Sequence, residues 1–316
     1  MTEDTPLRAL TGLAIVALGV AALACARHRR PGRPRHPATR PRSRDTVAAA
    51  RRLNSAAGTL AACVLSDSAV EHYRGSFHNK TMLAPLASAT MSLAASIHGR
   101  TDPRSTAHRA RDGAYALAIA TGIIGTAFHM FNIAKRTGGF SWQNLFYAAP
   151  IGAPAALCLS GILGAASERV RASPPGRAPR LFGMPAGRAL AALTSAGLLG
   201  TVGEAGLLHL RGAYHNPAMW VPVSLPPVAA GLLAATAVVP SRRLRSVTRG
   251  SLRVTALVGC LGAAFHTYGV SRGMGGWRNW SQNLLNGPPI PAPPAFTGLA
   301  LAGLAALELQ DPRDHG

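Results

Sequence analysis

Four histidines, at two positions that recur along the chain, are the residues best suited to chemistry. His72 and His209 close apolar runs, while His129 and His266 lie shortly before the ends of other apolar runs. Two imidazoles that face each other from separate transmembrane helices are what a b-type haem needs for axial ligation. One interpretation is therefore two haem sites. The structural alternative is that each histidine donates a hydrogen bond to a carbonyl or headgroup at the membrane boundary.

Two carboxylates lie deeper in the runs that His72 and His209 close. Asp67 and Glu204 each precede the histidine by roughly 7 Å of helix rise. Arginines placed seven residues after each acid fall near the same helical face, so an ion pair through water or a neighbouring helix is one interpretation. These arginines, Arg74 and Arg211, would also suit haem propionates.

A mixed site is the second interpretation of these acids. A carboxylate with two or three histidines suits a transition-metal ion, and it also suits a proton relay. The further histidines available to the two sites are His78 and His215. The asparagines that follow them, Asn79 and Asn216, have the sequence context of helix caps.

A second polar segment recurs after a glycine pair. Its tryptophans are typical of interfacial anchors, and its glycines and amides would also suit a lid over the histidines. The residues of this predicted lid are Gly138, Gly139, Trp142, Gln143 and Asn144, with Gly275, Gly276, Trp280, Gln282 and Asn283 in the second copy. The prolines that follow, Pro150, Pro154, Pro289 and Pro293, are expected to bend the fourth helix of each copy and free carbonyl groups.

Composition indicates what positions these residues. Of the 316 residues, 48% are hydrophobic and only 14% are charged, against about 25% charged in a soluble domain. Apolar runs near the length that crosses a bilayer predict an all-α, polytopic transmembrane helical bundle of about nine helices. The runs are 8–26, 54–73, 82–98, 113–134, 145–165, 189–209, 218–239, 254–271 and 292–309.

The arginines predict the orientation of that bundle. They concentrate in every second connection, near 27–52, 99–112, 166–188 and 240–253. By the positive-inside rule these connections are cytoplasmic, with the N-terminus outside and the C-terminus inside a bacterial inner (plasma) membrane. The net charge of +21 does not indicate nucleic-acid binding, because the basic blocks are dispersed and aromatics are only 5%.

An internal repeat organises the chain. Adding 137 to a residue number carries Asp67 to Glu204, His72 to His209 and His129 to His266, and a later offset of 139 carries Asn144 to Asn283. Four helices in each copy require both copies to cross the membrane in the same sense, as parallel repeats. The predicted parts are an N-terminal helix (1–26), a basic linker (27–52), a first repeat (53–166), a second linker (167–188), a second repeat (189–310) and a tail (311–316).

These observations predict a multi-pass protein of the lipid bilayer with two similar sites near its extracytoplasmic face. The leading hypothesis is an electron-transfer membrane subunit that binds haem b or a transition-metal ion and serves an extracytoplasmic redox protein. Two alternatives stay open. One is a proton-coupled transporter of a small solute, and the other is a non-catalytic membrane anchor or assembly partner.

Overall fold

The computed structural model describes residues 44–174 and 177–310. The helix predicted over 8–26, the linker up to residue 43 and the tail over 311–316 lie outside the described residues. The described part is helical except for a two-stranded antiparallel hairpin, formed by β1 (Arg180–Leu181) and β2 (Met184–Pro185).

Eight long helices, of 15 to 31 residues, make up most of the described chain. They are α2 (Arg44–Arg74), α3 (Ala84–Thr101), α4 (Arg109–Ala134), α6 (Gly152–Arg171), α7 (Ala186–Arg211), α8 (Val221–Val238), α9 (Arg242–Ser271) and α11 (Pro294–Glu308). Two short helices and three 3-10 turns join them. These are α5 (Trp142–Tyr147), α10 (Trp280–Asn286), η1 (Lys80–Leu83), η2 (Pro217–Trp220) and η3 (Gly276–Asn279).

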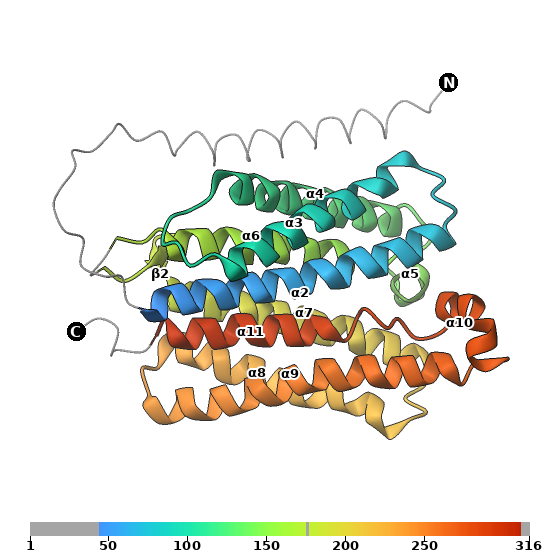
Figure 1. Cartoon of the computed structure of the whole chain (residues 1–316). Helices are drawn as coiled ribbons and strands as arrows, with labels where there is room; N and C mark the ends of the chain where they lie inside the picture. Colours follow the sequence, from blue (N-terminus) through green and yellow to red (C-terminus); the bar gives the residue numbers. More distant parts are fainter. Residues whose placement is uncertain (1–43, 175–176, 311–316) are drawn as a thin grey trace.

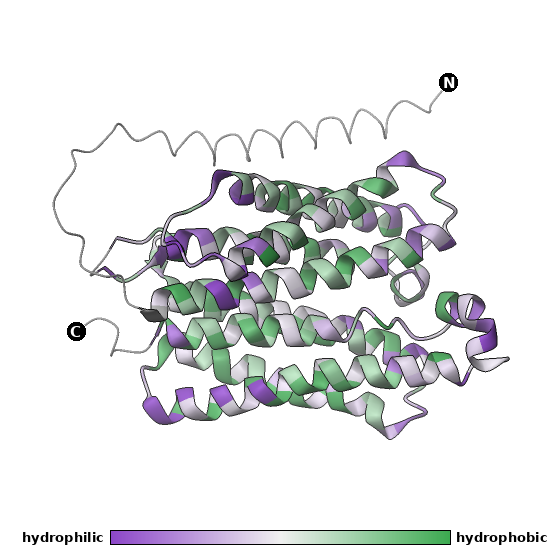
Figure 2. Cartoon of the chain, viewed as in Figure 1, coloured by the Kyte–Doolittle hydropathy of each residue, from purple (hydrophilic) through white to green (hydrophobic). Residues whose placement is uncertain are grey.

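The long helices lie side by side, so the bundle has two distinct ends (Figure 1). The connections 102–108, 172–185 and 239–241 lie at one end, which we call the basic end. The connections 75–83, 135–151, 212–220 and 272–293 lie at the other, which we call the histidine end. Hydrophobic residues dominate the middle of the long helices, and hydrophilic ones gather toward both ends (Figure 2).

Within residues 44–174 and 177–310, four helical segments are long and apolar enough to cross a membrane. They are Arg109–Ala134, Ala186–Arg211, Pro217–Val238 and Arg242–Ser271. The helix α2 is more polar, and it packs against α3, α6 and α11. A helix that is covered by other helices needs no continuous apolar surface, which accounts for its composition.

Each half of the described chain forms a four-helix arrangement. In the first, α2 and α4 each pack against α3 and α6; in the second, α7 and α9 each pack against α8 and α11. The halves meet chiefly where α2 packs on α11. The main hydrophobic core lies at this junction and includes Leu60, Leu198, Phe296 and Leu299.

Three predicted boundaries were wrong. The linker was predicted to end at residue 52, but α2 already begins at Arg44. Ala49 and Ala50 are buried, and this packing favours helix over these residues. The run 145–165 is not one helix, since the short α5 ends at Tyr147 and α6 begins at Gly152. The second linker, predicted over 167–188, contains the end of α6, the hairpin and the start of α7.

Candidate functional site

The histidines of the first half are fixed by hydrogen bonds to backbone carbonyls. The Nδ1 atom of His72, at the end of α2, lies 2.7 Å from the carbonyl oxygen of Met82. The Nδ1 atom of His129, near the end of α4, lies 2.6 Å from the carbonyl oxygen of Pro150. Each imidazole therefore ties the end of a long helix to the connection that directly follows that helix.

The second half repeats this geometry. The Nδ1 atom of His209 lies 2.9 Å from the carbonyl oxygen of Met219, and that of His266 lies 2.7 Å from the carbonyl oxygen of Pro289. The carbonyls of Pro150 and Pro289 accept these bonds just before α6 and α11 begin. Pro150 and Pro289 thus precede these helices and do not bend them, and histidines are the donors to their carbonyl groups.

These bonds decide which ring nitrogen is available. A carbonyl only accepts, so Nδ1 carries the proton in the neutral ring and Nε2 keeps a lone pair. Across residues 44–174 and 177–310, every hydrogen bond of His72, His129, His209 and His266 uses Nδ1. A ligating histidine is commonly held in this way, with its second nitrogen bonded to a carbonyl.

The two histidines of each half come from diagonal helices. His72 is on α2 and His129 on α4, and these helices share α3 and α6 as neighbours. The two imidazoles interact electrostatically, as His209 and His266 do in the second half. The two imidazoles of each pair are therefore near enough to influence each other's charge.

The mixed metal site predicted from sequence is not assembled. No group of three or more histidine, cysteine or acidic side chains placed to hold a metal ion occurs in the part of the chain that the structure describes. His78 and His215 are exposed, and their Nδ1 atoms bond to the carbonyls of Gly75 and Gly212 at 2.9 and 3.0 Å. They close their own turns instead of joining the other histidines.

The carboxylates lie between the two halves. Glu204 on α7 accepts a hydrogen bond of 3.3 Å from the backbone N–H of Gly152, at the start of α6. This position is favourable for a carboxylate because the N-terminus of a helix carries partial positive charge. A side chain at Gly152 would overlap the Glu204 carboxyl group. Asp67 on α2 interacts electrostatically with Glu71 and Glu204.

The arginines have partners other than these two acids. Arg74 forms an ion pair of 2.8 Å with Glu71, one turn away. Arg211 donates a hydrogen bond of 3.2 Å to the carbonyl oxygen of Phe146 and lies 5.0 Å from the ring centroid of Tyr147. The predicted pairing was therefore wrong: Arg74 does not pair with Asp67, and Arg211 does not pair with Glu204.

The predicted caps are present in both halves. The side chain of Asn79 accepts a hydrogen bond from the backbone N–H of Thr81 at 3.0 Å, and that of Asn216 accepts one from Ala218 at 2.9 Å. The chain enters both caps through a left-handed turn without glycine, at Ser76 and Phe77 and again at Ala213 and Tyr214. Such a turn is costly and persists only where its surroundings fix it.

The glycine pairs of the predicted lid have a structural role. Gly138, Gly139, Gly275 and Gly276 all have positive φ. The buried side chain of Asn144 donates to the carbonyl oxygen of Gly139 at 2.7 Å, and that of Asn283 donates to Gly276 at 2.9 Å. The remaining residues of the predicted lid, Trp142, Gln143, Trp280 and Gln282, are exposed.

Comparison with protein-family models, curated proteins and solved structures gave no match. The function is therefore argued from the geometry of this chain alone.

The sequence reasoning missed a buried ionic network at the basic end of the first half. Arg111 on α4 contacts Asp102 at 2.8 Å and Glu168 on α6 at 2.9 Å, and the three side chains are 2%, 8% and 1% exposed. Arg171 donates to the carbonyl oxygens of Gly99 and Asp102 at 2.6 and 2.7 Å. We call this set the buried ionic network.

Polar side chains extend the network toward α2. The hydroxyl of Tyr115 donates to Asn54 at 2.6 Å, and the amide of Asn54 donates to Ser167 at 2.5 Å. Burial alone raises the pKa of the Asp102 carboxyl, but hydrogen bonds from Arg111 and from the backbone N–H of Arg104, with the charges of Arg111 and Arg171, hold that pKa below its usual range. A signal in the sequence was the pair of charges, Arg111 and Glu168, near the ends of apolar runs.

Proposed function

We propose that the chain is a multi-pass protein of the plasma membrane, made of two parallel four-helix repeats after one N-terminal helix. Contacts that recur at offsets of 137 and 139 residues support the repeat, as do the matched His72–Met82 and His209–Met219 bonds. The gathering of arginine-rich connections at the basic end supports a cytoplasmic location for that end.

Cysteine labelling tests this topology. In a variant without the native cysteines, Ser76→Cys and Ala213→Cys should both react with a membrane-impermeant maleimide added to intact cells. Cysteine placed at Arg180, in the hairpin of the basic end, should react only after the cells are opened. Labelling of the two turns from opposite sides would contradict parallel repeats.

We further propose that each half binds one b-type haem through its two histidines. The observation that carries this proposal is the pair of imidazoles on diagonal helices, each anchored through Nδ1 and each with Nε2 free. Haem iron takes two axial imidazoles, whereas a protein-held metal ion usually needs three or four ligands. The two-histidine geometry therefore favours haem over a bare transition-metal ion.

In this proposal the chain is the membrane subunit of an electron-transfer system. Both sites lie at the histidine end, which would face the extracytoplasmic side and a soluble redox partner there. The protein would hold the iron in a surrounding of helices that limits water and sets its potential. Arg74 and Arg211 lie at the same end, although their present partners are Glu71, Phe146 and Tyr147.

A visible absorption spectrum of purified protein, together with metal analysis, tests the haem proposal. A Soret band is expected in the wild type, and it should disappear when His72, His129, His209 and His266 are all changed to alanine. The matched control is the double variant His78→Ala and His215→Ala, which removes histidines that only close their own turns. A wild-type protein that contains neither haem nor metal would contradict the proposed redox function.

One observation favours a second function, a proton-coupled transporter. Asp67 and Glu204 are largely enclosed, and they interact with each other across the junction of the two halves. Paired carboxyl groups inside a membrane protein are typical of proton relays. This function predicts that Asp67→Asn or Glu204→Gln abolishes pH-dependent uptake into proteoliposomes while the protein still folds. Uptake that is unaffected by both changes would exclude it.

A further inference from the structure

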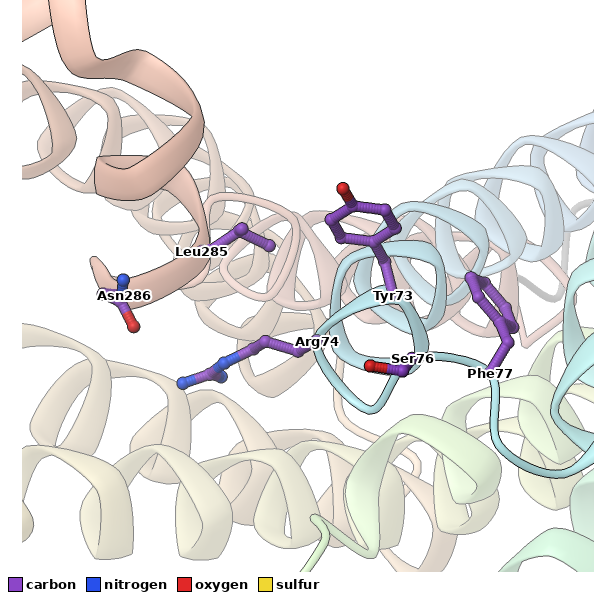
Figure 3. A pocket seen from close by; sticks show the side chains of 6 residues that line it. All are labelled: Tyr73, Arg74, Ser76, Phe77, Leu285 and Asn286. Atoms are coloured by element: carbon purple, nitrogen blue, oxygen red, sulfur yellow. The ribbon is translucent and has the colours of Figure 1, made fainter.

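An open pocket of about 470 Å³ lies at the histidine end, between the end of α2 and α10. Its lining residues are Tyr73, Arg74, Ser76, Phe77, Leu285 and Asn286. Figure 3 shows Arg74 extending toward Asn286. The pocket thus joins the two halves, since α2 belongs to the first and α10 to the second.

The offsets of 137 and 139 residues locate the equivalent place in the other half. There Arg211 takes the position of Arg74, and Phe146 and Tyr147 take those of Leu285 and Asn286. The guanidinium carbon of Arg211 lies 5.0 Å from the ring centroid of Tyr147, and Arg211 also donates to the carbonyl oxygen of Phe146. At this position the chain supplies its own phenol ring to cover the arginine.

The first position lacks that ring. Asn286 stands where Tyr147 stands in the other half, and it is too small to cover Arg74. Arg74 is instead held by Glu71, whose counterpart is Leu208. The ion pair keeps the guanidinium at the pocket wall, and the volume that a tyrosine ring takes in one half is open in the other.

We propose that this pocket binds the hydroxylated aromatic head group of a membrane quinol, with its ring against Arg74 as the Tyr147 ring lies against Arg211. Arginine attracts the face of an electron-rich ring, and quinols are the phenol-like compounds that a plasma membrane itself dissolves. The side-chain nitrogen of Asn286 donates to the carbonyl oxygen of Gln282 at 3.0 Å, so its Oδ1 atom remains to accept a hydrogen bond from a quinol hydroxyl. Ser76 offers a second hydrogen bond, and Tyr73, Phe77 and Leu285 offer apolar surface to the edges of the ring.

The role of the quinol in this inference rests on the proposed electron-transfer function, but quinol binding can be tested separately from haem binding. Haem ligation depends on His72 and His129, whereas the pocket is formed by Arg74, Asn286 and their neighbours. The haem-free double variant His129→Ala and His266→Ala should therefore still bind quinol.

Calorimetric titration of decylubiquinol into nanodiscs of phosphatidylcholine, under anaerobic conditions, tests the proposal. One molecule should bind per chain. Asn286→Tyr, which gives the pocket the ring found in the other half, should weaken binding by about tenfold or more. Tyr147→Asn is the matched control, and it should leave the affinity at Arg74 unchanged.

The same variants need a folding check, for which the thermal unfolding temperature of Asn286→Tyr should match that of the wild type. Unchanged binding by a folded Asn286→Tyr protein would overturn the proposal. It would also be overturned if phosphatidylglycerol in the nanodiscs displaced the quinol, since a lipid phosphate would then be the occupant of the pocket.

Discussion

The two halves of the molecule share most of their contacts at the histidine end and differ at the basic end. At the histidine end, each half has the same two imidazole bonds, one asparagine cap and one glycine pair held by an asparagine. At the basic end, the buried ionic network of the first half is replaced in the second by uncharged and mostly apolar residues. The counterparts of Tyr115, Asn54 and Glu168 are Leu252, Ala191 and Leu307, all fully buried.

This difference indicates that the helices at the basic end can pack either through buried charged residues or through mostly apolar residues. Buried charges and a well-packed apolar set can be similar in stability, because desolvation offsets much of the attraction between the charges. Packing alone therefore does not require the polar residues that both halves keep at the histidine end. The proposed haem ligation would give those residues a reason to be alike.

The largest effect is expected when the buried ionic network loses one member. Arg111→Ala leaves Glu168 and Asp102 buried without their main partner and should lower the free energy of unfolding by about 3 to 5 kcal/mol. The counterpart Thr248→Ala removes one hydroxyl that bonds to Leu244 and should cost about 1 kcal/mol. Thermal unfolding in detergent measures both, and equal losses would contradict the contrast between the two basic ends.

A smaller effect is expected when the whole network is replaced by the residues of the second half. No charge is then left without a partner, so the loss should be about 1 to 2 kcal/mol, less than that of Arg111→Ala alone. The changes are Asn54→Ala, Asp102→Val, Arg111→Thr, Tyr115→Leu, Ser167→Ala, Glu168→Leu and Arg171→Gln. If this variant fails to fold, the residues of the second half cannot replace the network in the first half.

The caps at the histidine end should behave nearly alike. Asn79→Ala and Asn216→Ala each remove a side-chain acceptor from the start of a 3-10 turn, at a cost of about 1 kcal/mol. The backbone bonds of the two caps match, but the hydroxyl of Thr81 also donates to Asn79 at 2.9 Å, so the unfolding temperature should fall slightly more for Asn79→Ala. A larger fall for Asn216→Ala would mean that the histidine ends are less equivalent than their contacts indicate.

The smallest effect is an acid dependence that belongs to the first half. The lowered pKa of Asp102 means that its contribution to stability is present above the ordinary aspartate value and is lost as the pH falls through the lowered one. Between about pH 6 and pH 2, the unfolding temperature should therefore fall more steeply for the wild type than for the variant that carries the residues of the second half, which lacks Asp102 and Glu168. Parallel declines would argue against this assignment.

The sequence predicted well those features that depend on local pattern. Apolar runs placed the long helices, and the Asn216-Pro217 order predicted a cap that the structure contains. The start of α6 was missed because Pro150 lies inside a continuous apolar run, which hides the break before Gly152.

Features that depend on distant contacts could not be predicted. The carbonyl partners of His129 and His266 are backbone groups, which have no signature in a sequence. Arg111 and Glu168 are 57 residues apart, and nothing in their spacing pairs them. Arg211 meets Tyr147 only because the two halves pack together, and an arginine seven residues after Glu204 favoured the wrong partner.

Counting haem in single-half variants tests the central claim most directly. A pyridine haemochrome assay should give two haems per chain in the wild type, one in His129→Ala, one in His266→Ala and none in the double variant. Full haem content in the double variant, or a wild-type protein without haem, would contradict the claim that paired imidazoles at the histidine end of each half hold the cofactor.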